Sequence, residues 1–418
     1  MKKFAALFLA MILVLGCCAV LAEEDPLRVS WWGSESSNKL YLGEAEMFTK
    51  ATGIEHDPEY YSWDEYWTKI NTLAAGGDLP DTLRMDYAYI LNYVEKNQLL
   101  DLTPLVESGA IDLSKVADST ISGGRFGNGL YGINAGSNGL CMAVNEKLVT
   151  DAGMEVPSNE MTWEEFEAWA IEFHEKTGLL GADLFGLKDY NGVFRIFARE
   201  HNEELYTQDG AGFSAETLAA FFASVKKLQD AGATQNIADA VTDIGKENYP
   251  FSKGEAATLF TVTDSYTTYA AVLKDSFGAV PMRVLPGAAA TKAMFVKPSQ
   301  FLSIAATSER VEDAAKFINY WVNDEEANLF IAGRRGVPIN PEIATLVGQS
   351  LSEESMLVFD YMNLMAGYAS DLYAPDPQAH IEISDEYNRR VQDVLYGEST
   401  PEAVAQELID YINKVMKQ

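Results

Sequence analysis

The apolar positions of this chain switch repeatedly between the period of a strand and the period of a helix. Over 27–32 nearly every second residue is apolar, which predicts a half-buried strand. Apolar residues recur at helical spacing over 38–51, and a second strand is predicted over 54–60. A capping box at 62–65 starts another helix, and a third strand follows over 82–85. This order of strands and helices predicts a parallel sheet with right-handed crossovers.

The alternation of strands and helices continues to the end of the chain. Strands are predicted over 131–134, 140–145, 256–262, 277–284 and 301–306, with a hairpin over 203–213. Helices are predicted to begin at a Thr162 capping box, at Ala215, at a Ser308 cap and at Pro401. No internal repeat, heptad pattern or low-complexity linker divides the sequence, which predicts domains that the chain crosses more than once.

Composition indicates a globular chain with more than one domain. The 418 residues predict two or three domains at about 150 residues each. Hydrophobic residues make up 47% and charged residues 22%, which excludes a disordered chain. The formal net charge of -31 argues against nucleic acid and anionic membrane surfaces as partners, because both require a basic surface. It is compatible with a protein that works outside the cell.

Met1–Ala22 has the pattern of an export signal, since two lysines precede a long apolar run. The segment Val14–Cys17 resembles the lipobox of bacterial lipoproteins, in which Cys17 is lipidated and becomes the N-terminus, and we favour this interpretation. Val20–Ala22 fits an ordinary signal peptidase instead, and an uncleaved membrane anchor is a third possibility. We therefore expect a lipid-anchored protein on the extracellular face of the membrane, or a secreted or periplasmic protein if cleavage follows Ala22.

The cysteines predict a domain without disulfides. Cys17 and Cys18 belong to the leader, so Cys141 has no partner within the rest of the chain. Cys141 lies in an apolar run and is expected to be a buried, inert thiol. The stability of this exported protein must therefore come from its core.

No residue pattern identifies a catalytic, metal or cofactor site. Gly127–Gly132 matches the dinucleotide pattern GxGxxG, but no helix follows it, so together with the glycines up to Gly139 it predicts a hairpin and a hinge. The four histidines have no metal-ligating neighbours at helical spacing. The 62 acidic residues are too many for a pair of glycosidase carboxylates to be recognised among them. We predict no catalytic residues, no metal and no cofactor.

Aromatic residues in polar segments are the clearest indication of a ligand. Trp32-Gly33 ends the first strand, at the edge where open α/β sheets bind ligands, and Trp63 follows the second strand. Asp86-Tyr87 and Asp264-Ser265-Tyr266 each place a carboxylate beside an aromatic ring just after a predicted strand. Aromatic faces stack on sugar rings, and carboxylates bind sugar hydroxyl groups. The alternative is that these tyrosines, together with Tyr190, cover the core and leave their hydroxyls in water.

Several segments resemble the family 1 extracellular solute-binding proteins of bacterial ABC importers, the carbohydrate type that includes maltose-binding protein. The matching segments are VSWWG, WDEYWTKINTLAAGGDLPD, RMDYAYI, LYGINAGSNGLCMAVNEKLVTDAGMEVPS, MTWEEFEAWA, FSKGEAATL, AAKFINYWVNDEEA and GVPIN. They occur in the order typical of the family from residue 27 to about 415, so the resemblance covers nearly the whole chain after the leader.

The resemblance implies a two-lobed, periplasmic-binding-protein-like α/β fold of type II. Each lobe is expected to have a mainly parallel sheet flanked by helices, with the ligand in the cleft between the lobes. The expected N-lobe is 27–134 plus 278–323, and the expected C-lobe is 135–277 plus 324–418, after a leader of 1–22. The lobes are expected to close on the ligand by a hinge motion.

The resemblance also implies capture of a sugar or oligosaccharide and its delivery to the transmembrane subunits of an ABC permease. The protein is then expected to be a monomer without catalysis or cofactor. The expected ligand-binding residues are Trp32, Gly33, Glu35, Trp63, Asp86, Tyr87, Tyr190, Asp264, Tyr266, Ser299 and Asp385. Where maltose-binding protein has cleft tryptophans, this chain has Tyr266 and Asp385, so maltose specificity is not expected. The alternatives are a receptor for a polyol phosphate, polyamine or peptide, or a secreted glycoside hydrolase.

Overall fold

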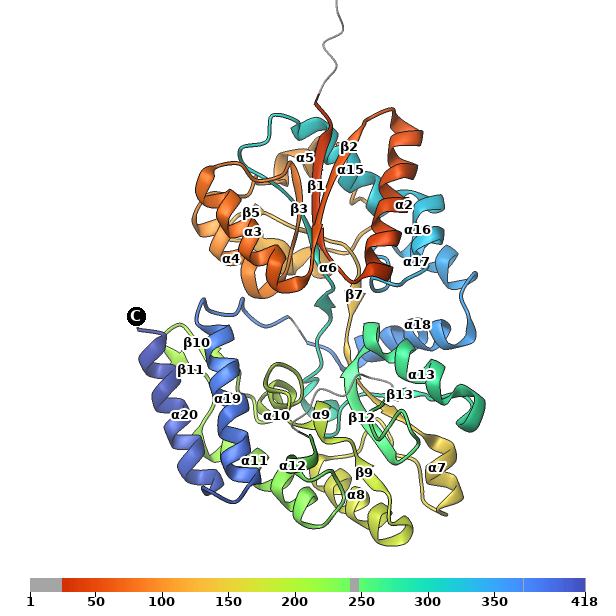
Figure 1. Cartoon of the computed structure of the whole chain (residues 1–418), viewed down its shortest axis with the longest axis vertical. Helices are drawn as coiled ribbons and strands as arrows, with labels where there is room; N and C mark the ends of the chain where they lie inside the picture. Colours follow the sequence, from red (N-terminus) through yellow and green to blue (C-terminus); the bar gives the residue numbers. More distant parts are fainter. Residues whose placement is uncertain (1–24, 241–247, 371, 418) are drawn as a thin grey trace, which may run out of the picture.

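The protein consists of two α/β lobes joined by extended crossing segments (Figure 1). The computed structural model describes residues 25–240, 248–370 and 372–417. The leader and its two predicted cleavage sites, including Cys17, lie outside the described residues. In Figure 1 the N-lobe is at the top and the C-lobe, with the end of the chain, is at the bottom.

The N-lobe has a central sheet covered by helices on both faces. Its strands are β1 (Leu27–Trp32), β2 (His56–Tyr61), β3 (Thr82–Met85), β6 (Ile133–Asn134) and β15 (Phe301–Ile304), in the spatial order β2-β1-β3-β15-β6. Its helices are α2 (Glu35–Thr52), α3 (Trp63–Gly76), α4 (Tyr87–Glu95), α5 (Thr103–Glu107), α6 (Asp118–Ile121), α15 (Val311–Asn323), α16 (Glu325–Ile331) and α17 (Pro341–Gly348). A hairpin of β4 (Arg125–Phe126) and β5 (Gly129–Leu130) lies where the glycine pattern predicted one.

The C-lobe has a second sheet, also covered by helices. Its strands are β8 (Leu140–Val144), β9 (Leu180–Ala182), β12 (Ala256–Val262) and β13 (Met282–Arg283), in the order β13-β8-β12-β9. Its helices are α7 (Glu146–Asp151), α8 (Trp163–Thr177), α9 (Leu184–Leu187), α10 (Arg195–Glu200), α11 (Ala215–Asp230), α12 (Ile237–Ala240), α13 (Thr263–Phe277), α14 (Ala288–Thr291), α18 (Glu353–Met365), α19 (His380–Leu395) and α20 (Pro401–Val415). The predicted hairpin over 203–213 is present as β10 (Tyr206–Thr207) and β11 (Gly210–Ala211).

Two short strands connect the lobes. β7 (Ser137–Asn138) and β14 (Lys297–Pro298) pair antiparallel, and Ser137 also exchanges backbone hydrogen bonds with Val337. Gly136 permits this close packing, because a Cβ atom there would lie 2.4 Å from the carbonyl oxygen of Arg335. These two crossing segments therefore pass between the lobes as one hydrogen-bonded ribbon, and the chain crosses a third time between α17 and α18 (Figure 1).

The two sheets are mixed, whereas mainly parallel sheets were expected. β1 pairs in parallel with β2 and β3, but β15 runs antiparallel to β3, and β8 runs antiparallel to β12 and β13. The reason is that the chain enters each lobe from the crossing ribbon. β15 and β8 each start at the crossing ribbon and run away from it, while β3 and β12 run toward the other lobe. A strand that enters a lobe from the ribbon therefore runs antiparallel to neighbouring strands that run toward the ribbon.

Two lobe boundaries also differ from the prediction. The segment after residue 278 was expected in the N-lobe, but β13 pairs with β8 and α14 packs on α10, both in the C-lobe. The segment after residue 324 was expected in the C-lobe, but α16 packs on α2 and α15 in the N-lobe. The predicted strand over 277–284 is correspondingly short, because α13 extends to Phe277.

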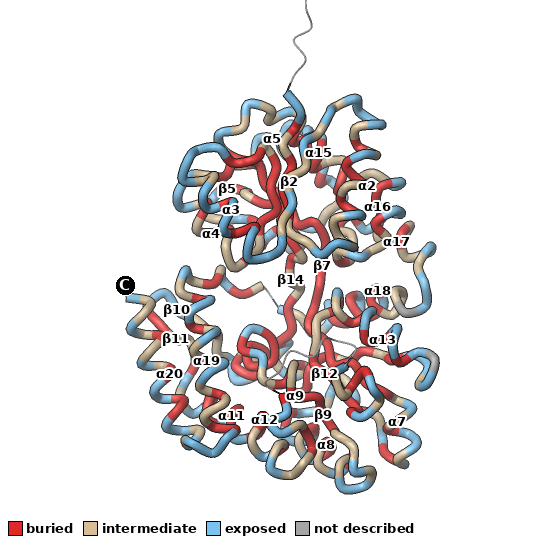
Figure 2. Tube along the Cα trace, in the orientation of Figure 1, coloured by how far each residue is buried: buried red, intermediate tan, exposed pale blue. Residues whose placement is uncertain are grey.

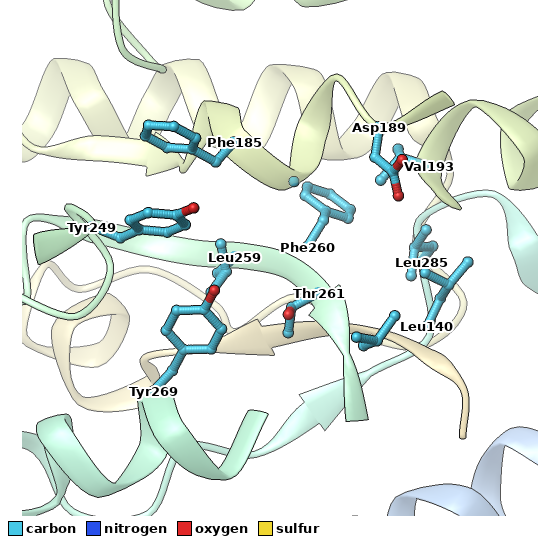
Figure 3. A pocket seen from close by; sticks show the side chains of 12 residues that line it. Leu140, Phe185, Asp189, Val193, Tyr249, Leu259, Phe260, Thr261, Tyr269 and Leu285 are labelled. Atoms are coloured by element: carbon cyan, nitrogen blue, oxygen red, sulfur yellow. The ribbon is translucent and has the colours of Figure 1, made fainter. Parts of the chain in front are cut away.

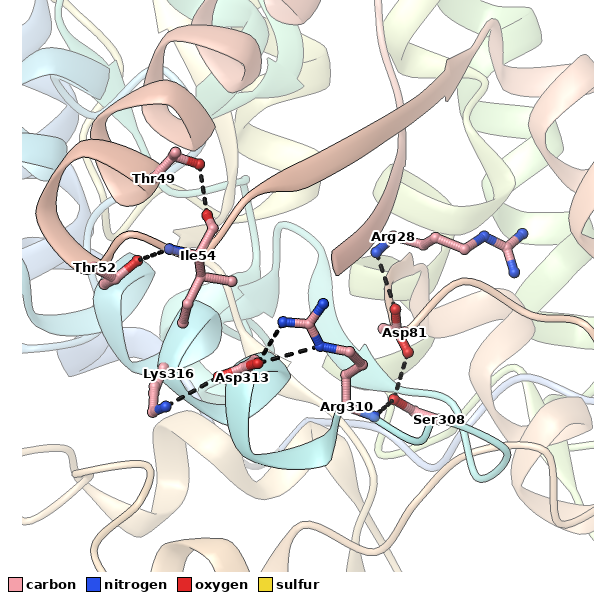
Figure 4. Close-up of polar contacts among 9 residues, drawn as sticks. All are labelled: Arg28, Thr49, Thr52, Ile54, Asp81, Ser308, Arg310, Asp313 and Lys316. Atoms are coloured by element: carbon pink, nitrogen blue, oxygen red, sulfur yellow. Dashed lines mark hydrogen bonds and ion pairs between the residues drawn. The ribbon is translucent and has the colours of Figure 1, made fainter. Parts of the chain in front are cut away.

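Local sequence signals explain most helix starts. The Thr162 hydroxyl accepts a hydrogen bond from the N–H of Glu165, whose carboxylate accepts one from the N–H of Thr162, as the capping box predicted. Ser308 does not cap α15, however. Its hydroxyl donates to Asp81 at 2.6 Å and accepts from the N–H of Arg310, so it ties the loop to β3 and the helix begins at Val311 (Figure 4).

The core follows the strand alternation of β1. Leu27, Val29 and Trp31 are buried against α2 and α15 on one face of the N-lobe sheet. The next residue, Trp32, points to the other face and contacts the rings of α3. Figure 2 shows the inner strands of both lobes buried and the outer faces of the helices exposed, and within the N-lobe sheet only the edge strand β2 has no buried residue. The cleft-side end of β1 is therefore aromatic on both faces.

Candidate ligand-binding site

A cleft of about 260 Å³ lies between the lobes at the crossing ribbon. Its N-lobe wall is formed by the first residues of α3 and α4, and its floor by Asn138 and Lys297 of β7 and β14. Its C-lobe wall is formed by 189–192 and by the segment 373–381. Both lobes and the ribbon thus contribute to one site, as binding between two domains requires.

The N-lobe wall presents aromatic rings. Trp63, the first residue of α3, is 40% exposed and makes an edge contact with Trp32, with 5.0 Å between the ring centroids. Tyr89 of α4 stacks on Trp67 at 3.9 Å and also contacts Trp63 at 5.9 Å. Trp32, Trp63, Trp67 and Tyr89, with Tyr66 behind them, form what we call the N-lobe aromatic cluster. Trp63 and Tyr89 are the members that line the cleft.

Beside these rings the N-lobe wall carries a carboxylate. Asp86 follows β3 and caps α4, where its Oδ1 accepts a hydrogen bond of 2.9 Å from the N–H of Ala88. Its side chain also lines the cleft. The start of α4 therefore fixes an acidic group next to an exposed aromatic surface.

The C-lobe wall carries polar groups on a turn of π-helix over 190–194. Asp189 and Asn191 line the cleft, and the Asp189 carboxylate accepts a hydrogen bond of 3.1 Å from the N–H of Asn191. Desolvation by the enclosing cleft walls raises the pKa of Asp189 above its usual range. Tyr190, between these two residues, points the opposite way and is buried.

The segment 373–378, which we call the strap, is held to the C-lobe by a buried ion pair. The Arg195 guanidinium lies 2.7 Å from Asp376, with the two side chains only 2% and 5% exposed, and 3.4 Å from the centroid of the Tyr373 ring. His380 Nε2 lies 3.6 Å from Asp376, but burial lowers the pKa of His380. The Tyr87 hydroxyl donates to the Tyr373 carbonyl at 2.7 Å, which connects the strap to the N-lobe.

A second pocket of about 250 Å³ lies within the C-lobe, next to the cleft (Figure 3). Leu140, Asp189 and Val262 line both spaces. Phe185 and Tyr249 stack at 4.3 Å on one side of it, and most of its other lining residues are apolar (Figure 3). The inter-lobe cleft therefore has an apolar side pocket.

The structure places three of the predicted site residues, Trp63, Asp86 and Tyr87, in the cleft wall. Trp32 lies one ring behind Trp63, and the N–H of Gly33 bonds to the Tyr61 carbonyl.

The other predicted residues lie elsewhere. Tyr266 is fully buried and donates to the Val280 carbonyl, and Tyr190 packs on Tyr387 at 4.6 Å, so both belong to the C-lobe core and not to the cleft. Asp264 lines a separate groove on α13, Ser299 has a buried hydroxyl, and Glu35 and Asp385 are exposed on α2 and α19 away from the cleft lining.

Sequence reasoning missed most of the polar residues of the cleft. These are Asn138, Asp189, Asn191, Lys297, Asp376 and His380, with the aromatic residues Tyr89, Phe295 and Tyr373. The predicted residues Tyr190 and Ser299 lie within two residues of Asp189 and Lys297. The sequence therefore indicated the correct segments of the chain, but not which side chains face the cleft. Pro375 and Pro377 also indicate an extended segment, but not its contact with Arg195.

Comparison with known proteins agrees with this architecture. Residues 45–354 match the bacterial extracellular solute-binding protein family. The chain belongs to this family.

Solved structures of family members share the fold over nearly the whole chain. An extracellular solute-binding protein family 1 member from Alicyclobacillus acidocaldarius is 24% identical, with 95% of this chain and 100% of the other covered and a TM-score of 0.77. A periplasmic solute-binding protein from Pectobacterium atrosepticum is 20% identical, with 94% and 98% covered and a TM-score of 0.81. A periplasmic oligogalacturonide-binding protein from Yersinia enterocolitica is 21% identical, with 94% and 98% covered and a TM-score of 0.77. The two-lobed fold is thus that of extracellular solute-binding proteins.

No helix within the described ranges is both long enough and apolar enough to span a bilayer. No group of three or more histidine, cysteine or acidic side chains there is arranged to hold a metal ion.

Proposed function

We propose that this solute-binding protein captures a sugar or oligosaccharide in the inter-lobe cleft and delivers it to the permease of an ABC importer. The observation that carries the proposal is the composition of the cleft wall. Trp63 and Tyr89 offer aromatic faces for the C–H side of a sugar ring, and Asp86, Asn138 and Asn191 offer polar groups for its hydroxyls. The solved relative from Yersinia enterocolitica, whose structure contains digalacturonic acid, supports a carbohydrate ligand.

The proposed mechanism is binding without chemistry. A ligand between Trp63 on one lobe and Asn191 on the other contacts both lobes only when they are close together. It therefore favours the closed form by its differential affinity for that form. The Tyr87–Tyr373 hydrogen bond already joins the lobes at one edge of the cleft, so closure would proceed around this edge and the crossing ribbon. The closed, monomeric complex would then bind the transmembrane subunits of the permease.

The binding proposal is tested by a ligand screen on the soluble chain starting at Glu24. We expect one class of mono- or oligosaccharide to raise the melting temperature, because a ligand at 100 times its Kd adds about 2.7 kcal/mol to the free energy of unfolding. Polyols, sugar phosphates, amino acids, peptides and polyamines serve as the comparison set. A shift with phosphates or amines alone would overturn the carbohydrate proposal and leave the family assignment intact.

A reducing-sugar assay on the same ligands separates binding from hydrolysis. We expect no release of reducing ends over many hours with any ligand that raises the melting temperature. Steady turnover would instead support a glycoside hydrolase, which needs two carboxyl groups at a fixed separation across the bound sugar.

We also propose that the protein is anchored to the extracellular face of the membrane through a lipid on Cys17. Cys17→Ala in the full-length chain is then expected to move the protein from the membrane fraction to the medium or periplasm, because the lipid is its attachment. Fractionation and immunoblotting measure this, with Cys18→Ala as the matched control. A Cys17→Ala variant that stays in the membrane fraction would show that an uncleaved leader anchors the chain.

A further inference from the structure

The floor of the cleft carries one positively charged side chain, Lys297, that is not paired with any carboxylate in the described chain. Lys297 lies on β14 of the crossing ribbon, between the lobes, and is the one lysine or arginine among the described residues that line the cleft. Within the described part of the chain its ammonium group has no hydrogen bond and no ion pair within 4 Å. The side chain is half-buried, so water solvates the ammonium group only in part.

The acidic groups near Lys297 are each held by other donors. Asp376 forms its ion pair with Arg195, and Asp86 caps α4 through the N–H of Ala88. Asp189 accepts a hydrogen bond from the N–H of Asn191. These carboxylates attract the lysine from a distance but leave its three N–H donors free for a ligand.

The charges around Lys297 keep it protonated. Burial by itself would lower the pKa of Lys297, but the carboxylates of Asp86 and Asp376 and the phenol group of Tyr373 outweigh this effect and raise it above its usual value. Arg195 acts in the opposite direction and does not cancel the increase. The cleft therefore presents a permanent cation at neutral pH.

We infer that the ligand is an acidic sugar, a mono- or oligosaccharide that contains a uronic acid, whose carboxylate binds the Lys297 ammonium. The inference rests on the proposed carbohydrate-binding function and narrows it to one class of sugar. A half-enclosed ammonium group with free donors gains most from a charge-assisted bond to an anion. One ammonium balances the single charge of a carboxylate. A phosphate dianion would need a second free cation, and the cleft instead has three acidic residues.

The aromatic rings and the lysine fit two different parts of such a sugar, its C–H face and its carboxylate. A uronic acid ring keeps the C–H face that can stack on Trp63 or Tyr89, and its carboxylate projects from the ring edge. Trp63 and Tyr89 belong to the N-lobe wall, whereas Lys297 belongs to the floor, so both groups can contact one ring from different sides. The net charge of -31 repels anions over long distances, but at physiological ionic strength this repulsion is screened beyond about 8 Å.

The test compares each uronic acid with its neutral parent, for example galacturonate and galactose oligomers of equal length, by titration calorimetry. We expect the acidic sugar to bind at least 10-fold more tightly. Lys297→Met should weaken its binding by about 10- to 100-fold and leave binding of the neutral parent nearly unchanged, because a bond to a charged group is lost. Lys297→Arg should retain most of the affinity. Lys69→Met, which removes an exposed charge on α3 outside the cleft lining, should change neither.

A second measurement separates a ligand role from a structural one. Without ligand, Lys297→Met should lower the melting temperature modestly, because the folded protein holds the ammonium group near the carboxylates of Asp86 and Asp376. The neutral parent sugar reports on this structural effect, so an equal loss of affinity for the neutral and the acidic sugar would mean that Lys297 only maintains the fold, and would overturn the inference. If a neutral sugar binds as tightly as its uronic acid and Lys297→Met affects neither, the inference is wrong and the carbohydrate proposal stands. If no sugar binds at all, or only a sugar phosphate binds, both the proposed carbohydrate function and the inference of an acidic sugar are overturned.

Discussion

Asp376→Asn is expected to lower the free energy of unfolding by about 3–5 kcal/mol. The substitution keeps the shape of the side chain but removes the negative charge that lies 2.7 Å from the Arg195 guanidinium. Arg195 is only 1% exposed, so water cannot replace the carboxylate. The cost comes from the uncompensated buried cation more than from the lost hydrogen bond. Urea unfolding followed by circular dichroism, in the absence of ligand, measures this change.

Two further variants define the cause of that change. Asp385→Asn, at the exposed sixth residue of α19, is the matched control and should alter stability by less than about 0.5 kcal/mol. Asp376→Leu combined with Arg195→Met removes both charges, so it should recover a large part of the loss. If Asp376→Asn costs less than about 1 kcal/mol, the pair is hydrated in solution and does not hold the strap to the C-lobe.

The sequence predicted the elements of this fold better than their relative directions. The period-2 pattern of β1 correctly placed Trp31 and Trp32 on opposite faces of a strand, because a strand must alternate its side chains. The antiparallel directions of β15 and β8 depend on where the chain crosses between lobes. No local pattern records that crossing, so mainly parallel sheets were expected.

The sequence correctly predicted only those residues of the candidate site that lie just after the end of a strand. Asp86 follows β3 directly and Trp63 follows β2 after one residue, so the position of the strand determines the position of the residue. The predictions for Tyr190 and Tyr266 were wrong for a different reason. A shift of one residue along a helical turn moves a side chain from the cleft to the core, and the sequence does not determine which residue of the turn faces the cleft. The Arg195–Asp376 pair, 181 residues apart, arises only from tertiary packing.

Trp63→Ala is expected to weaken binding of the sugar ligand by about 1–3 kcal/mol, a five- to 150-fold change in Kd. Trp63 is the most exposed member of the N-lobe aromatic cluster and lies in the cleft wall, so its ring is free to stack on a sugar. The same exposure means that its removal should cost the fold little. Titration calorimetry gives the affinity, and the ligand-free melting temperature gives the stability.

Trp32→Ala is the matched comparison, because its ring touches Trp63 but does not line the cleft. Trp32 also packs against the buried Trp67 and Tyr66, so its loss should lower stability by more than that of Trp63 and affinity by less. Trp63→Phe should retain part of the affinity, since it keeps a smaller aromatic face. Unchanged affinity in a folded Trp63→Ala variant would remove this ring from the site, and a larger loss of affinity with Trp32→Ala would mean that the sugar reaches the deeper ring.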